Sequence, residues 1–212
     1  MKVLLINGSP NQNGCTNRAL VEIAHTLHEE DIETEIFWIG NKAISGCLAC
    51  YTCMKTGKCV IKGDKVSEFL ELAKGADGFI FGSPVHYAAA SGAITSFMNR
   101  AFLSDLAGNG NKTFYMKPAA AVVSARRAGT TATFDQLNKY FTIQEMPVIS
   151  SRYWNMVHGN TPEDVEQDME GLHVLRVLAR NMAYFLRCKE AGKKAGVPLP
   201  KLEEYVFTNF IR

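Results

Sequence analysis

The sequence predicts an α/β fold in which a five-stranded parallel sheet carries helices on both faces. Short apolar runs of strand length recur five times along the 212 residues, and they alternate with segments of helical periodicity. The clearest runs are continuous rather than alternating, which is typical of parallel strands buried on both faces. Strands that alternate with helices in this way form right-handed crossover units, and these units build a parallel sheet.

Each expected strand is supported by its composition and by the turn that follows it. KVLLING and TEIFWIG are apolar runs that end in glycine, and DGFIFGSP ends in a Gly-Ser-Pro turn. KPAAAVVSA and MPVISSRYW supply the fourth and fifth runs. In chain order, the strands are expected at residues 2–8, 34–40, 77–84, 117–125 and 146–154.

The expected helices are supported by apolar side chains at three- and four-residue spacing. The first places Leu20, Ile23 and Leu27 on one face. The last begins with Thr161 as its cap and Pro162 at its first position, where a missing N–H costs nothing. In chain order, the helices are expected at residues 17–30, 64–77, 90–102, 134–141 and 161–190.

The chain length suits one domain with a small appendage. We expect this domain to cover residues 1–190, including a cysteine-rich loop at 45–64 after the second strand. Residues 191–212 have no clear pattern that would pair them with the domain. We therefore interpret them as a C-terminal tail that drapes over the domain or reaches another subunit.

Composition narrows the class of protein. Hydrophobic residues make up 47% of the chain and charged residues 21%, and the formal net charge is only +2. No block of like charge dominates, which argues against a nucleic-acid or membrane-surface binder. The first apolar run is too short for a signal-peptide core or a membrane span, so a cytoplasmic protein is expected.

The turn after the first strand has the parts of a phosphate-binding loop. Ser9 and Thr16 supply hydroxyls, Gly14 is conformationally permissive, and a helix N-terminus follows directly. The turn has neither a G-x-G-x-x-G fingerprint nor the lysine of a nucleoside-triphosphate loop. A monophosphate held by hydroxyls and backbone N–H groups therefore fits better, and an ordinary capped turn is the alternative.

Two further loops follow the third and fourth strands. Pro84 fixes the backbone ahead of Val85 and His86, so that N–H groups can point at a flat heteroaromatic ring. The alternative for His86 is a solvent-facing loop residue. The loop after the fourth strand contains Arg126 and Arg127, of which one is expected to contact a ligand, although adjacent arginines also occur on solvated surfaces.

Four of the six cysteines lie close together in the segment 45–64. Their spacing is C-x2-C-x2-C-x5-C, formed by Cys47, Cys50, Cys53 and Cys59. In a reducing compartment, such clustering indicates metal or redox chemistry rather than a disulfide framework. The spacing suits an iron–sulfur cluster, while zinc, free redox-active thiols and a structural role stay open. Of the other two cysteines, Cys188 is expected in the core.

Three segments together resemble one known family: GSPNQNGCTN, SPVHYAAASGAITSFMNR and SARRAGTT, on this strand pattern. They look like the flavodoxin-like, NAD(P)H-dependent FMN reductase superfamily. The cysteine segment makes the chain most similar to the iron–sulfur flavoprotein branch of that superfamily. The resemblance covers about residues 1–155. The chain departs from the family pattern at His86, Thr95 and Asn99, where an aromatic residue, a lysine and an aspartate are common.

The resemblance implies a flavodoxin-like fold and an FMN-dependent oxidoreductase. It implies no catalytic side chain, because the flavin carries the redox chemistry. FMN is then the cofactor, the four cysteines hold a [4Fe-4S] cluster, and NAD(P)H is an electron donor. The implied FMN contacts lie on the three loops: Ser9, Asn11, Gly14, Thr16, Asn17, Pro84, Val85, His86, Tyr87, Ser124, Arg126, Arg127 and Gly129.

The resemblance also implies a dimer or tetramer that exchanges electrons with a small molecule or a redox protein. Placed after the second strand, the cysteine segment is expected at the same sheet edge as the flavin loops. Two other functions stay open at this point. One is a flavin or quinone reductase without a cluster, and the other is a flavodoxin-like electron carrier, which the low acidic content disfavours.

Overall fold

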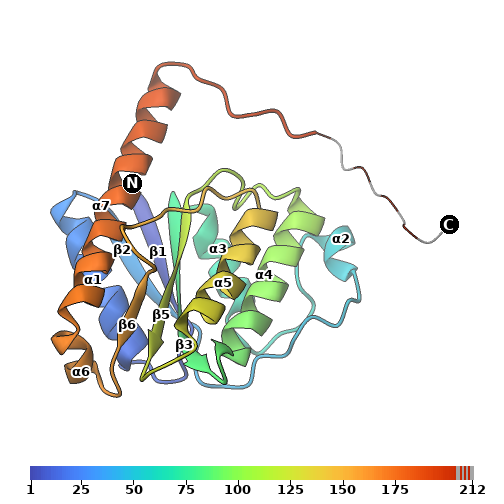
Figure 1. Cartoon of the computed structure of the whole chain (residues 1–212). Coiled ribbons are helices and arrows are strands. Elements are labelled where there is room, and N and C mark those ends of the chain that lie inside the picture. The colour runs from blue at the N-terminus through green and yellow to red at the C-terminus, as the bar shows by residue number, and fades with distance from the viewer. Residues whose placement is uncertain (204–205, 207, 209, 211–212) are drawn as a thin grey trace.

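The computed structural model describes residues 1–203, 206, 208 and 210, and the fold is the expected α/β layered sheet (Figure 1). Five parallel strands lie in the order β2-β1-β3-β5-β6. This is the doubly wound order of flavodoxin-like proteins, with its topological switch between β1 and β3. The strands are β1 Lys2–Asn7, β2 Glu33–Trp38, β3 Gly78–His86, β5 Ala119–Ala125 and β6 Met156–His158.

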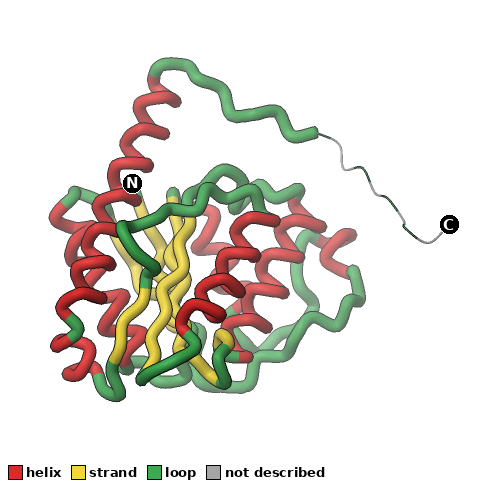
Figure 2. Tube along the Cα trace, viewed as in Figure 1, coloured by secondary structure: helices red, strands yellow, loops and turns green. Residues whose placement is uncertain are grey.

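Helices cover both faces of the sheet, as Figure 2 shows. One face packs against α1 and α7 through Leu20, Ile23 and Leu178, and the other packs against α3, α4 and α5 through Phe69, Phe97 and similar side chains. The helices are α1 Cys15–Glu29, α2 Thr52–Thr56, α3 Val66–Lys74, α4 Gly92–Asn109, α5 Thr130–Ile143, α6 Pro162–Gln167 and α7 Met169–Lys194.

The fifth strand does not lie where the sequence predicts it. Residues 147–149 make one bridge to Ala119, through Ala119 N–H to Pro147 O at 2.9 Å and Ile149 N–H to Ala119 O at 2.9 Å. The chain then leaves the sheet and returns as β6, beyond the predicted end at residue 154. Buried Asn155 fills the gap, because its side-chain amide donates to Ala121 O at 3.0 Å.

The predicted helix 161–190 is two helices. The expected cap at Thr161 is confirmed: its hydroxyl accepts from Asp164 N–H at 3.3 Å, and Pro162 occupies the first position. The break falls at Asp168, whose carboxylate accepts from Gly171 N–H at 2.9 Å and so caps α7. The same carboxylate accepts from His158 N–H at 2.7 Å, which ties the break to the end of β6.

The last turns of α7 extend beyond the sheet (Figure 1). Cys188 on this part of α7 is exposed, so the prediction that it lies in the core is wrong. The helix itself continues to Lys194, past the expected domain end at residue 190. The predicted tail 191–212 therefore begins as helix, and residues 204–205, 207, 209 and 211–212 of it lie outside the described part of the chain.

No helix in the described part of the chain is long and apolar enough to cross a membrane.

Candidate functional site

The loops that follow β1, β3, β5 and β6 converge at the carboxyl edge of the sheet, at the bottom of Figure 1. They enclose a cavity of about 300 Å³. In a doubly wound sheet, the carboxyl edge beside the topological switch is where ligands bind. The lining residues are Ser9, Asn11, Gly14, Cys15, Thr16, Pro84, Val85, His86, Ser124, Ala125, Arg126, Gly159, Asn160 and Pro162.

The first loop is shaped by a fully buried asparagine at the end of β1. Asn7 Oδ1 accepts from Ser9 N–H at 3.0 Å, and Asn7 Nδ2 donates to Gln12 O at 3.0 Å. Ser9 Oγ accepts from Asn11 N–H at 3.1 Å, and the indole of Trp38 donates to Ser9 O at 2.8 Å. The turn is thus fixed from within the sheet and from the neighbouring strand.

This loop delivers the N-terminus of α1 to the cavity. Gly14 is the cap residue, no side-chain cap bond is made there within the described residues, and the first turn has no acidic residue. Thr16 and Ser124 join the loop to the end of β5, with their hydroxyl oxygens 2.7 Å apart. A helix start with free N–H groups and nearby hydroxyls is a site for an anion such as a phosphate.

The second loop is a tight hairpin formed by β3 and the short antiparallel strand β4, Ala89–Ala90. Its two central residues, Tyr87 and Ala88, have φ of 51° and 59°. Positive φ at both positions is the conformation of a type I′ turn, which is strained for residues other than glycine. Buried Ser83 steadies the hairpin by accepting from Ser91 N–H at 3.1 Å.

The third loop packs directly against this hairpin at Gly129. Gly129 has φ of +96° and caps α5, and a Cβ there would lie 2.7 Å from Ala88 Cα and 2.8 Å from Val85 Cγ1. Only glycine combines that backbone conformation with so close an approach. The loops after β3 and β5 therefore form one continuous wall of the cavity.

Nine of the predicted contact residues line the cavity, and four do not. The side chain of Tyr87 is fully exposed and Arg127 is exposed, while Gly129 supports the wall from behind. Asn17 lies on α1, where its side-chain oxygen accepts from Asn7 Nδ2 at 3.5 Å. The nine are Ser9, Asn11, Gly14, Thr16, Pro84, Val85, His86, Ser124 and Arg126.

Sequence reasoning missed the wall contributed by β6. Gly159 and Asn160 line the cavity, and Cys15 Sγ approaches Gly159 O at 3.5 Å. The two residues follow a strand, as the other loops do, and would have been found had the fifth strand been placed at 156–158. Asn7 and Trp38 were missed as well, because they act on the loop rather than line the cavity.

The four cysteines are brought together around a second, smaller cavity of about 20 Å³. The chain curls tightly here, with positive φ at Ala49, Tyr51 and Gly57. Ala49 N–H donates to Cys47 Sγ at 3.4 Å. Hydrogen bonds from the backbone and side chain of Thr52 lower the pKa of Cys50, which favours its thiolate. The four thiols are Cys47, Cys50, Cys53 and Cys59.

The cysteine loop begins at the flavin edge, after β2, but its cysteines lie beside the middle of α4 and away from that edge, contrary to the expectation. It packs along α4, and near its middle Cys53 and Gly57 leave no room for a side chain at Gly108. Gly108 lies 16 residues beyond the start of α4 at Gly92, which is about 24 Å at the helical rise of about 1.5 Å per residue. The loop therefore climbs from the end of β2 to the far part of α4 (Figure 1).

Within the described residues, no group of three or more His, Cys, Asp or Glu side chains is arranged to hold a single metal ion. The donor set nonetheless fits a larger group: four thiols face one cavity, and N–H donors point at two of the sulfurs. In a [4Fe-4S] cluster each thiolate binds a different iron, so the sulfurs lie farther apart than around one ion.

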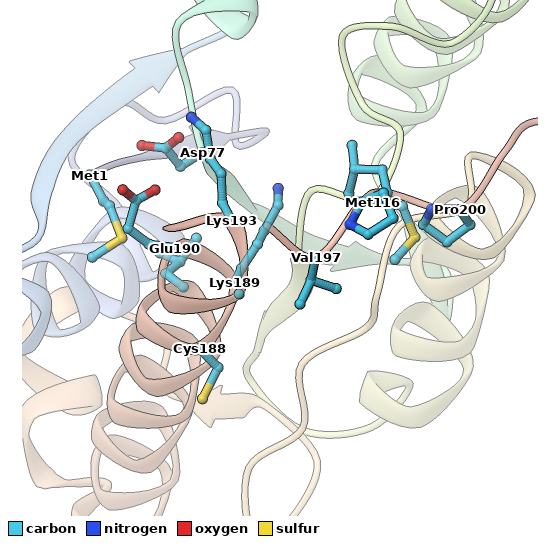
Figure 3. A pocket seen from close by; sticks show the side chains of 13 residues that line it. Met1, Asp77, Met116, Cys188, Lys189, Glu190, Lys193, Val197 and Pro200 are labelled. Atoms are coloured by element: carbon cyan, nitrogen blue, oxygen red, sulfur yellow. The ribbon is translucent and has the colours of Figure 1, made fainter. Parts of the chain in front are cut away.

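A further cavity, of about 730 Å³, lies at the opposite end of the sheet (Figure 3). Its walls come from the starts of β1, β3 and β5, at Met1, Asp77 and Met116, and from the end of α7 with Val197 and Pro200 of the tail. The amino ends of parallel strands do not form the ligand site of this fold. This cavity is therefore separate from the candidate flavin site.

Comparison with known proteins agrees with this geometry. The family model of the NADPH-dependent FMN reductases matches residues 1–161. An iron–sulfur flavoprotein of Methanocaldococcus jannaschii is 33% identical over 86% of this chain and 96% of its own length. A second iron–sulfur flavoprotein of the same organism is 32% identical over 83% of this chain and 92% of its own length.

Solved structures of low sequence identity share the fold. A structure of RosB with a bound 8-demethyl-8-formylriboflavin-5′-phosphate intermediate has a TM-score of 0.70 at 16% identity, covering 100% of this chain and 94% of the other. A WrbA-like flavodoxin from Agrobacterium tumefaciens has a TM-score of 0.61 at 14% identity, covering 88% and 98%. With this fold and the family match together, the chain belongs to the NADPH-dependent FMN reductase family and is a flavin-dependent oxidoreductase.

Proposed function

We propose that this flavin-dependent oxidoreductase binds FMN in the cavity at the carboxyl edge and a [4Fe-4S] cluster in the cysteine loop. The observation that carries the flavin site is the convergence of four strand-end loops on the free N-terminus of α1. When bound, FMN supplies hydride and single-electron transfer. The chain supplies binding, orientation and electrostatics.

The phosphate of FMN is proposed to lie at the start of α1. The hydroxyls of Ser9 and Thr16 and the amide of Asn11 surround that position, and the N–H groups of the first turn point into it. The helix dipole adds partial positive charge there. Gly14 lets the loop pack closely on itself, since a Cβ at this position would lie 3.2 Å from Asn11 Nδ2.

The isoalloxazine ring is proposed to lie against Pro84, Val85 and His86. We assign to this wall the backbone donors that would bond the polar edge of the ring and stabilise added negative charge. Arg126, from the adjoining loop after β5, contributes a positive charge to the same cavity. His86 is proposed to border the ring at the position where the family commonly has an aromatic residue. Tyr87 does not take this role, because its side chain is exposed to solvent in the single chain.

The cluster is proposed to be held by Cys47, Cys50, Cys53 and Cys59. When bound, a [4Fe-4S] cluster supplies one-electron transfer, which would let the protein connect a two-electron donor such as NAD(P)H with a one-electron acceptor. The relatives named iron–sulfur flavoproteins support this assignment. Zn²⁺ is the competing occupant for four thiolates.

The deciding experiment is chemical analysis of the anaerobically purified protein for FMN, iron, sulfide and zinc. We expect about one FMN per chain together with iron and sulfide. Cys50→Ser should lose the iron and keep the FMN, whereas Cys188→Ser, which changes an exposed cysteine outside the loop, should keep both. Absence of flavin would overturn the flavin proposal, and zinc in place of iron would overturn the cluster.

A reductase without a cluster is the second candidate, and the match to the family of NADPH-dependent FMN reductases favours it. In that case NADPH oxidation should be equally fast in the wild type and Cys50→Ser, with two-electron and one-electron acceptors alike. A cluster that takes part in electron transfer predicts instead that Cys50→Ser retains turnover with two-electron acceptors and loses it with one-electron acceptors.

We also propose that the protein assembles as a homo-oligomer through the end of α7 and the tail. Tyr184, Val197, Leu199 and Leu202 expose large apolar side chains on this segment. Exposed apolar groups that cluster in one region mark an association surface.

A further inference from the structure

Arg100, in the middle of α4, is the largest fully buried side chain in the described part of the chain. Its guanidinium has five N–H donors, and each donor has an acceptor. Nε donates to Cys59 Sγ at 3.3 Å, and one terminal nitrogen donates to Ser45 O at 3.4 Å and to the carboxylate of Asp64. The other donates to Ile61 O at 3.0 Å and Asp64 Oδ1 at 3.3 Å.

These acceptors all belong to the cysteine loop. Ser45 lies just before its first cysteine, whereas Ile61 and Asp64 follow its last. One side chain thus holds both ends of a 20-residue segment, 45–64, against α4. Closing such a loop costs conformational entropy, and an anchor common to both ends offsets that cost.

The contact with Cys59 goes beyond what a structural anchor needs. A buried guanidinium is tolerated when its charge is paired and its donors are satisfied, and Asp64 with the two carbonyl groups already meets most of that need. The remaining donor points at a sulfur that is itself one of the four cavity thiols. A charged N–H donor bonds best to an anionic acceptor, which a metal-bound thiolate is.

We propose that Arg100 is a positioning residue for the metal site: it fixes the cysteine loop against α4 and directs a hydrogen bond at the sulfur of Cys59. The sulfur part of this inference rests on the cluster proposed above, and the loop part does not. Lysine cannot replace Arg100, because an ammonium group lacks the planar fork that reaches five acceptors at once.

The loop part is tested by limited proteolysis of the full-length protein with trypsin, since Lys55, Lys58 and Lys62 lie inside the segment. We expect cleavage there to be at least about tenfold faster in Arg100→Lys and Asp64→Asn, because cleavage follows local opening. Arg180→Lys is the matched control, since Arg180 makes only half-exposed ion pairs at 3.9 and 4.0 Å. FMN content and circular dichroism report that the variants fold.

The sulfur part is tested by the midpoint potential of the cluster, measured on the iron-loaded fraction of each variant. Hydrogen bonds to cluster sulfurs stabilise the reduced, more negative form and raise the potential. Arg100→Lys should therefore shift the potential to a more negative value, and Arg180→Lys should leave it unchanged. A purely structural role for Arg100 would not move the potential of the loaded fraction.

The outcomes separate the two proposals. Wild-type cleavage rates in both Arg100→Lys and Asp64→Asn overturn the loop part, and an unchanged potential overturns the sulfur part. If the wild-type protein takes up no iron, the cluster proposal fails and the sulfur part fails with it, while the cleavage rates still decide the loop part. Should Arg100→Lys not fold, Asp64→Asn decides the loop part, and Arg100→Gln, which also lacks the Nε donor to Cys59, replaces Arg100→Lys in the potential measurement.

Discussion

Individual residues in the proposed flavin site act mainly by fixing loops rather than by chemistry. Buried Asn7 satisfies its amide within the first loop, and the hydroxyls of Thr16 and Ser124 join two loops. Buried polar groups of this kind are costly to leave unpaired, so each specifies one conformation of the backbone around it. These hydrogen bonds therefore fix the shape of the cavity.

Thr16→Val tests the proposed phosphate end of the cavity. The change keeps the side-chain shape but removes a buried hydroxyl, and one hydrogen bond corresponds to roughly a 3- to 10-fold change in affinity. We expect the Kd of FMN, measured by fluorescence titration of the apoprotein, to rise by about that factor. Thr26→Val is the control, because Thr26 is also buried on α1 but donates to Glu22 O at 3.0 Å, away from the cavity. Equal Kd values for both variants would contradict the assignment.

Gly129→Ala tests the wall between the second and third loops. The new Cβ would collide with Ala88 and Val85, and the φ of +96° is strained for alanine. We expect the free energy of unfolding to fall by about 2–3 kcal/mol and FMN binding to weaken. Gly196→Ala shares the positive φ, at +77°, but meets nothing within 4 Å. It should cost only about 1 kcal/mol and leave FMN binding unchanged. Denaturant titration separates the two variants.

At the scale of elements, the helices on one face of the sheet are joined by ion pairs as well as by apolar packing. Glu22 on α1 accepts from Arg18 at 3.0 Å and from Arg176 of α7 at 2.5 Å. Burial of this carboxyl opposes ionisation, but the hydrogen bonds from Arg176 and Arg18 outweigh it and lower the pKa of Glu22. The packing of α1 on α7 therefore depends on an ionised carboxylate.

The free energy of unfolding should depend less on pH in Glu22→Gln than in the wild type. A pKa lowered by folding contributes stability above the unfolded-state value of about 4.3, and this contribution is lost as pH falls through the folded-state value. We expect Glu22→Gln to be less stable than wild type by about 1 kcal/mol at pH 7, with the difference vanishing as Glu22 becomes protonated in the wild type. Glu190→Gln, which removes an exposed pair with Lys194 at 3.6 Å, is the control. A difference that is independent of pH would refute this role of Glu22.

At the scale of the whole molecule, the two ends of the sheet are used differently. The carboxyl edge holds the candidate flavin cavity, while the amino edge is covered by the end of α7 and the tail, with the cavity of about 730 Å³ between them (Figure 3). Among the described residues of the tail, Val197 N–H donates to Gly192 O at 2.9 Å, and Tyr115 donates to Pro200 O at 3.1 Å. A segment held by few contacts in one chain is suited to contact another.

The double change Val197→Asp and Leu199→Asp tests this surface. Burying two carboxylates at an apolar interface is unfavourable, so we expect an oligomer in the wild type and a smaller species in the variant, by light scattering after size exclusion. Met169→Asp is the control, because Met169 is equally exposed on α7 but lies at its other end. A monomeric wild-type protein would contradict the proposal.

The sequence by itself determined the α/β fold class, the strand-end loops and the grouping of the four cysteines, because these depend on local signals. Apolar runs, glycine turns and short cysteine spacings are read within a few residues. The predicted position of the fifth strand was wrong because it was also read from local signals. MPVIS is apolar, but Pro147 lacks an N–H, and the ladder of hydrogen bonds resumes only at Met156. Its misplacement also hid Gly159 and Asn160 from the predicted site.

The tertiary structure alone decided where the cysteine loop lies and what holds it there. Arg100 is a charged residue in a helical pattern, and its burial follows from acceptors 36 to 55 residues away in the sequence. Its carboxylate partner, Asp64, is likewise ordinary in the sequence. Burial of a charge depends on the sum of contacts from distant segments. Local sequence patterns do not show contacts between distant segments, so only the folded chain shows that Arg100 holds the cysteine loop.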